Sequence, residues 1–275
     1  MEAADSSIPV EKTSTITGSS LQKLDSYWDE VEGMPVPETI PNIDLNDFPE
    51  NHRIDMFNLA RDAWVDIYNP ATLLTHLQSD EVSNDKRREL KDLRKHGLVL
   101  RAAYKSLDGR HMAPQKHWLF LKLLGELNDN YYSPQRVESK EKLADFVEKQ
   151  YMSLDGLEFF SATNKSFQDH YNKELALVNK LNDEDVLPAH DFHLMRKLLR
   201  NSMNTFRLSG TLTHDPKITQ VARYMQDLNE TLGKKQDQLV QQDIRGELAY
   251  GDAAVIVPPE EKRKIQGFVR ANVNV

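Results

Sequence analysis

The sequence predicts an all-α fold made of two similar helical halves, and three observations lead to this prediction. From residue 52 onward, apolar residues recur at the three- and four-residue spacing of amphipathic helices. No segment there shows a sustained alternation of apolar and polar residues, as a half-buried strand would. Two of the expected helices and the segments that follow them carry matching motifs, which indicates an internal repeat. We therefore expect a two-repeat helical domain over residues 51–275.

Residues 1–50 differ in composition and are expected to form a mostly disordered or extended acidic tail. They hold 11 Asp/Glu against two lysines, whereas the other 225 residues hold 32 acids and 33 Lys/Arg. One stretch, "SSLQKLDSYWDEV", has helical spacing, with Leu21, Leu24, Tyr27 and Trp28 on one side, so a short helix here could dock on the domain. The net charge of −8 therefore says little about what the domain binds.

The first half of the domain, about residues 52–153, is expected to contain four helices. Pro70 interrupts the first of them, Ser83 is a candidate N-cap of the second, and Gly109 would end it. The expected ranges are 52–68 with a continuation to about 79, 84–107, about 114–129, and 137–152.

The second half, about residues 157–250, repeats this organisation. Pro188 stands near the start of one helix, and Asp215 should cap another with Pro216 in its first turn. A β-like "AAVIV" precedes the last helix. The expected ranges are about 157–181, 188–208, 216–246 and a C-terminal helix at about 258–270.

The internal repeat rests on two pairs of motifs in the same order. "KDLRKHGLVLRAAYKSL" (91–107) aligns with "HDFHLMRKLLRNSMNTF" (190–206) at an offset of 99 residues. Further on, "LGELND" and "LGKKQD" each place an aspartate four residues after the glycine, at an offset of 108 residues for Gly125 and Gly233. We expect these glycines to allow close helix packing or a kink. The order of the motifs predicts two halves related by a pseudo-twofold axis.

Each repeated helix concentrates its cations on one side, next to its apolar stripe, at about 100° per residue. We call these two groups the first and second ridges. The first ridge is Arg87, Lys91, Arg94, Arg101 and Lys105; the second is His190, His193, Arg196, Lys197, Arg200 and Arg207. Under the pseudo-twofold, the two ridges would line one groove and favour a phosphate-rich ligand, with the histidines adding pH dependence.

Other interpretations stay open at this point. The ridges could be ordinary solvated faces, neutralised by the acids of a flanking helix such as Glu138, Glu141, Asp145 and Glu148. RNA could bind the same ridges, although aromatic residues are not interleaved with the cations. There is no cysteine, HExxH, P-loop or GxSxG motif, so we expect no metal, no cofactor and no enzymatic activity. Because no secretory signal or membrane-spanning stretch is evident, a cytoplasmic protein with no membrane partner is expected.

The "HDFH" helix with spaced arginines, followed by "LG…D", resembles the conserved histidine α-helical domain (CHAD) family over about residues 52–250. There, "HDLR" and "LGELxD" helices occur twice per domain. The resemblance implies paired helical bundles that bind inorganic polyphosphate, with His190 as the motif histidine and Arg200 as a motif arginine. This chain departs from the pattern with Lys91 in place of the first histidine and His193 in place of an arginine. A weaker or shorter ligand, or a scaffold that has lost its ligand, stays open.

The acidic tail could compete for the basic groove. Its balance of −9 would then favour folding over the two ridges, and removing residues 1–50 should tighten anion binding at low salt.

Overall fold

The protein is all-α in the part of the chain that the structure, a computed structural model, describes: residues 19–153 and 157–272. Its only strands in that part are β1 and β2, a two-residue antiparallel pair that matches the β-like stretch in the sequence. The predicted fold class is therefore confirmed. The elements are α1 (Ser20–Gly33), η1 (Leu45–Asp47), α2 (Glu50–Ile67), α3 (Pro70–Gln78), α4 (Asn84–Leu107), α5 (Gln115–Asp129), α6 (Arg136–Gln150), α7 (Asn164–Asp183), β1 (Leu187–Pro188), α8 (Ala189–Thr213), α9 (Pro216–Ile244), η2 (Tyr250–Asp252), β2 (Ala254–Val255) and α10 (Pro259–Asn272).

Several helix ends follow directly from their capping residues. The Ser83 side chain accepts a hydrogen bond from the backbone N–H of Lys86, and the Asp215 side chain accepts one from that of Lys217. Pro70 does not bend a continuous helix: α2 ends before it, and Asn69 caps a new helix, α3, in which Pro70 occupies the first turn.

The predicted helix at 157–181 is wrong at its start, because α7 begins only at Asn164. The preceding residues are extended and pair with the segment after α4. The Gly109 N–H donates to the Phe160 carbonyl at 2.6 Å, and the Ala162 N–H donates to the Leu107 carbonyl at 3.0 Å. These tertiary hydrogen bonds override a local helical pattern.

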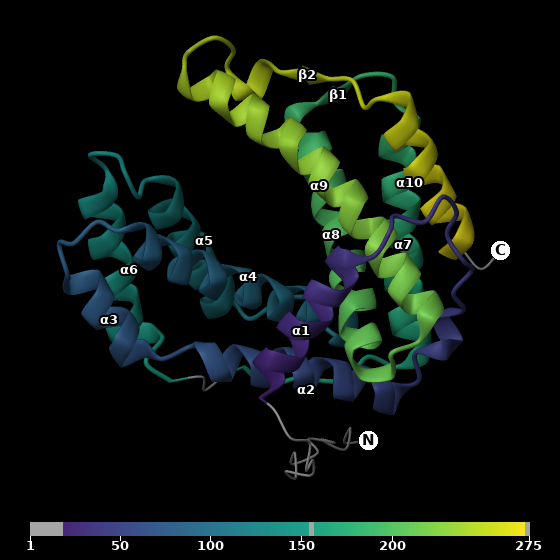
Figure 1. The fold of residues 1–275 in the computed structure, drawn as a ribbon, viewed down its shortest axis with the longest axis horizontal. Coiled ribbons are helices and arrows are strands. Elements are labelled where there is room, and N and C mark those ends of the chain that lie inside the picture. Colours follow the sequence, from purple (N-terminus) through teal and green to yellow (C-terminus); the bar gives the residue numbers. More distant parts are fainter. Residues whose placement is uncertain (1–18, 154–156, 273–275) are drawn as a thin grey trace, which may run out of the picture.

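The helices form two groups that meet at α4 and α8 (Figure 1). In the first group α5 packs on α4, α6 on α5 and α3 on α6. In the second group α7 and α9 pack on α8, and α10 packs on α7 and α9. Helix α2 runs along the base and contacts both α4 and α8, and α1 crosses obliquely and contacts α2, α8 and α9. The contact between α4 and α8 is the feature that positions the candidate site.

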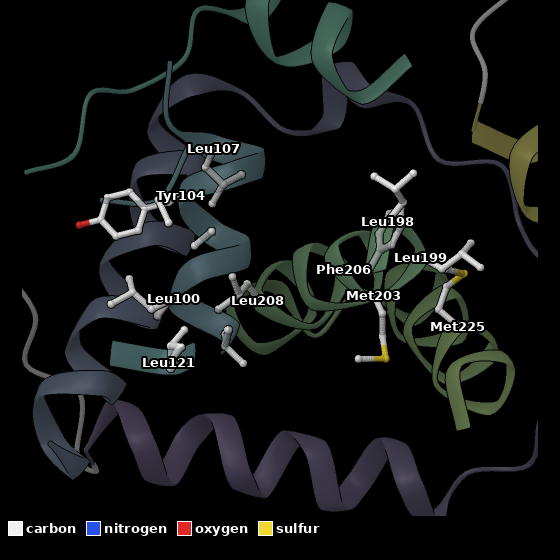
Figure 2. Packing of buried hydrophobic residues seen from close by; sticks show 14 of the residues in the cluster. Leu100, Tyr104, Leu107, Leu121, Leu198, Leu199, Met203, Phe206, Leu208 and Met225 are labelled. Carbon is white, nitrogen blue, oxygen red and sulfur yellow. The ribbon is translucent and has the colours of Figure 1, made fainter. Parts of the chain in front are cut away.

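One hydrophobic core connects the two groups. Figure 2 shows Leu100, Tyr104 and Leu107 along α4 and Leu199, Met203 and Phe206 along α8. All six are buried, as the apolar stripes of the two helices predict. Because these stripes face the core, each adjoining ridge is held at the edge of the α4–α8 contact.

The folded part of the chain begins well before residue 51. The predicted docking helix is α1, and its Leu24, Tyr27 and Trp28 are all buried in the same core. Residues 34–49 are mainly extended, and Phe48 among them is also buried. The expectation of disorder therefore applies only to residues 1–18, which lie outside the described residues. Within the described ranges, no helix combines the length and the hydropathy needed to cross a membrane.

Candidate anion-binding site

Six cations from the two ridges lie close enough to interact electrostatically where α4 meets α8. We call them the basic cluster: Arg94, Arg101 and Lys105 from α4, with Arg196, Lys197 and Arg200 from α8. The two ridges thus face a common region instead of opposite sides of the molecule, as the pseudo-twofold predicted.

Repulsion between cations on the two helices contributes to the lowered pKa values of the cluster residues. Burial lowers the pKa of Arg200 to about 10, and the charges of Arg196, Arg101 and Arg94 act in the same direction. The pKa of Lys197 is lowered by burial and then by Arg101, Arg200 and Lys105. Like charges brought together in a partly buried place destabilise one another, so an anion bound there would relieve a cost that the free protein carries.

No acid neutralises the cluster directly. Among residues 19–153 and 157–272, none of the six side chains has a hydrogen bond or an ion pair. Burial lowers the pKa values of Arg196 and Lys105, and the charges of Asp237 and Glu174 only partly offset this; neither carboxylate contacts its cation.

Two of the four acids that could have neutralised the ridges are paired elsewhere. Glu138 pairs with Lys142 at 2.6 Å, and Asp145 pairs with Lys149, both within α6. Lys140 is likewise paired, with Asp80 at 2.9 Å. These ion pairs leave Glu138, Asp145 and Asp80 unavailable to the basic cluster.

Two glycines accommodate two of the cluster's arginines. A Cβ atom on Gly125 of α5 would lie 2.8 Å from Nη2 of Arg94, and one on Gly233 of α9 would lie 3.0 Å from Nη2 of Arg196. The same contact thus occurs once in each half. It relates Arg94 to Arg196, a separation of 102 residues, whereas the motif alignment used an offset of 99. Aligning the two halves by this contact therefore shifts the second half by about one helical turn relative to the motif alignment.

His193 lies beside the cluster and is held in its neutral form. Burial lowers its pKa to about 4, and Lys197, Arg196 and Arg200 add to the effect. The polar side chain of Gln236 acts in the opposite direction on this pKa. Gln236 in turn donates to the hydroxyl of Tyr250 at 2.5 Å, which fixes the amide next to the imidazole.

Four predicted residues do not join the cluster. Arg87 stacks over the ring of Tyr132, 4.7 Å from its centroid, and Lys91 is exposed. His190 is exposed at the start of α8 and pairs with Asp191 at 3.2 Å.

The fourth, Arg207, is buried under α1, with its guanidinium 4.9 Å from the ring centroid of Trp28. Arg207 shares the helix face of Arg200 but lies two turns further along α8, where α1 crosses. Its inclusion in an exposed binding surface was wrong. Lys95 lies over the same indole at 4.0 Å, so α1 covers this part of the basic surface.

The sequence analysis did not single out Gln236, and it did not relate Gly125 and Gly233 to the arginines that contact them. The available signal was the spacing Gly-x-x-Asn/Gln, which occurs in both halves as Gly125 with Asn128 and Gly233 with Gln236. Both amides reach the N-terminal end of the neighbouring ridge helix. Asn128 donates to the Leu90 carbonyl, and Gln236 lies beside His193.

Other features of the described surface lie away from the cluster. A hollow of about 680 Å³ is formed by residues 36–42 and α10, with Tyr224 of α9. None of the six residues of the basic cluster lines this hollow. Within the described ranges, no group of three or more His, Asp or Glu side chains could hold a metal ion.

Comparison with known protein families, with curated proteins and with solved structures found no match to this chain. The candidate site therefore rests on its own geometry and charge.

Proposed function

We propose that this protein binds inorganic polyphosphate, or a similar linear phosphate polymer, along the basic cluster and without catalysis. The observation that carries the proposal is the set of six unpaired cations contributed by α4 and α8. Arginine forms charge-assisted, often bidentate, hydrogen bonds with phosphate oxygens, and lysine adds point charges. A chain of phosphates would give each cation a partner.

The resemblance to the CHAD family supports the same ligand. With the register of 102 residues, the histidine of "HDLR" corresponds to His193, and the arginine three residues later corresponds to Arg196. In the first half the matching positions are Lys91 and Arg94. A cytoplasmic location and the absence of a membrane partner belong to this proposal as predictions of the sequence.

The test is a titration with long-chain polyphosphate at several salt concentrations. Replacing Arg94, Arg101, Arg196 and Arg200 by alanine should weaken binding at least a hundredfold, because a hydrogen bond to a charged group contributes about 1.5–3 kcal/mol. The slope of log affinity against log salt should also become shallower, because fewer counterions are released.

A matched control removes four positive charges elsewhere. Lys122, Lys142, Lys149 and Lys165 are exposed, and each forms an ion pair with an acid four residues further along or back in its helix. Their fourfold alanine variant lowers the net charge equally and should bind polyphosphate nearly as the wild type does. Equal losses in the two variants would mean that only net charge matters, and the proposed site would be rejected.

Two other functions remain as outcomes of the same titration. If the wild type does not bind polyphosphate at low salt, a helical interaction or scaffold role replaces the proposal. If a single-stranded RNA of equal charge displaces polyphosphate from the wild type and outbinds it, the cluster is an RNA-binding surface.

A further inference from the structure

We infer that Gly125 and Gly233 are positioning residues that hold Arg94 and Arg196 in place for phosphate. This inference rests on the proposed function and assigns a role to residues outside both ridges. Each glycine is buried in the interior of a long helix, α5 or α9, at the point where a guanidinium from the paired helix crosses it.

The distances show why a side chain is excluded. A Cβ atom on Gly125 would lie 2.8 Å from Nη2, 3.1 Å from Cζ and 3.2 Å from Nε of Arg94. On Gly233 it would lie 3.0 Å from Nη2 and 3.5 Å from Cζ of Arg196. The Nη2 contacts are closer than the packing of carbon and nitrogen atoms normally allows. Each guanidinium therefore lies against the helix and would have to move outward if a methyl group were added.

Helix stability does not explain the two glycines. Glycine is less favourable than alanine in a helix interior, because it loses more conformational freedom on folding. Neither residue has a positive φ, the conformation that specifically favours glycine. The close approach of the arginines is therefore the feature that requires glycine at these two positions, despite its lower helix propensity.

Both guanidinium groups also have an unused donor. The Nε atoms of Arg94 and Arg196 are buried and have no hydrogen-bond partner among the described residues. A guanidinium packed against a helix loses side-chain freedom before any ligand arrives. Such preorganisation reduces the entropy that binding must overcome.

The recurrence of the contact makes this a property of the repeat. Gly125 lies 31 residues after Arg94, and Gly233 lies 37 residues after Arg196. Despite these different separations, each glycine meets the arginine of its own half. The two contacts thus mark equivalent phosphate positions on the two halves.

The experiment compares Gly125→Ala and Gly233→Ala with the wild type, measuring both polyphosphate affinity and melting temperature. Each variant should keep or raise the melting temperature, because alanine favours the helix. Each should weaken binding by about tenfold, the effect of misplacing one charge-assisted hydrogen bond. A purely structural role predicts the opposite pattern, with the melting temperature lowered and the affinity unchanged.

Gly267→Ala is the matched control. Gly267 also lies within a helix, α10, but its added Cβ would meet only the Tyr224 hydroxyl at an ordinary 3.5 Å. This variant should gain stability and bind as the wild type does.

A double-variant cycle tests whether the glycine acts through its arginine. In an Arg94→Ala background, Gly125→Ala should cause no further loss of affinity. A further tenfold loss there, or wild-type affinity in both single glycine variants, would overturn the inference. If Gly125→Ala proves unstable, Gly233→Ala decides the question with the Arg196→Ala background. If the wild type does not bind polyphosphate, the proposed function itself is rejected. This result differs from wild-type affinity in the glycine variants, which rejects only the inference.

Discussion

The pH dependence of anion binding should come from His193 and not from His190. In the free protein, burial and the nearby cations lower the pKa of His193 to about 4, so its imidazole is neutral at pH 7. Phosphate groups that neutralise Lys197, Arg196 and Arg200 would remove their repulsion and raise this pKa. The complex then takes up a proton as the pH falls, so affinity rises as the solution becomes more acidic.

The expected size follows from the two pKa values. If binding restored the pKa of His193 from about 4 to its ordinary 6.5, affinity at pH 5 would exceed that at pH 7 by about twentyfold. Burial is the larger cause of the lowered pKa, and it persists in the complex. We therefore expect a several-fold increase, with about twentyfold as the ceiling.

Calorimetric titration with polyphosphate measures this directly, at pH 5 and pH 7 and in two buffers of different ionisation enthalpy. The wild type should take up a fraction of a proton on binding near pH 5.5, and His193→Gln should take up less. His190→Gln removes an exposed histidine from the same helix and should leave the uptake unchanged. The reasoning is refuted if wild type and His193→Gln show the same dependence of affinity on pH.

Two further predictions concern stability. His117 is fully buried between the Tyr151 hydroxyl and the Gly97 carbonyl, and burial lowers its pKa from 6.5 to about 4. The contribution of neutral His117 to the free energy of unfolding is present above pH 6.5 and is lost as the pH falls toward 4. In urea unfolding, His117→Gln should therefore lose about 3 kcal/mol less stability than the wild type over this pH range. Parallel pH profiles of the two proteins would contradict this. Trp28→Ala should lower the free energy of unfolding by about 3–5 kcal/mol, because this indole is buried and packs against Arg207; a loss below about 1 kcal/mol would mean that α1 is a detachable tail.

This packing of α1 also changes the expected effect of deleting residues 1–50. The deletion removes Leu24, Trp28 and Phe48 from the core and should unfold the protein instead of unmasking a binding groove. The acidic segment does contact cations, because Trp28 packs on Arg207 and Asp25 pairs with Lys95, but it does so as a fixed part of the fold. Only a shorter deletion, of residues 1–18, tests competition by the tail.

Much of the local structure could be predicted because it depends on short-range chemistry. The N-caps at Ser83 and Asp215 are read from neighbouring residues, and the sides of α4 and α8 that carry cations follow from 3.6 residues per turn. A helical wheel, however, shows only the angle of a residue around the helix and not where it lies along the axis. It therefore grouped Arg207 with Arg200, although α1 covers only the former.

The register of the repeat required tertiary information. Sequence matching aligned Arg101 with Arg200 through similar neighbours, whereas the packing relates Arg94 to Arg196 through Gly125 and Gly233. An arginine crossing a glycine on another helix leaves no periodic signal in either segment. For the same reason, the extended pairing of Leu107 with Ala162 could not be read from the helical pattern that preceded α7.

The most direct test of the central claim is a lysine-acetylation footprint with and without long-chain polyphosphate. The claim is that a phosphate polymer occupies the place where α4 meets α8. Lys105 and Lys197 should be strongly protected by the polymer, whereas Lys142 and Lys149 on α6 should react equally in both samples. Uniform protection of all four lysines, or none at Lys105 and Lys197 under binding conditions, would contradict the account.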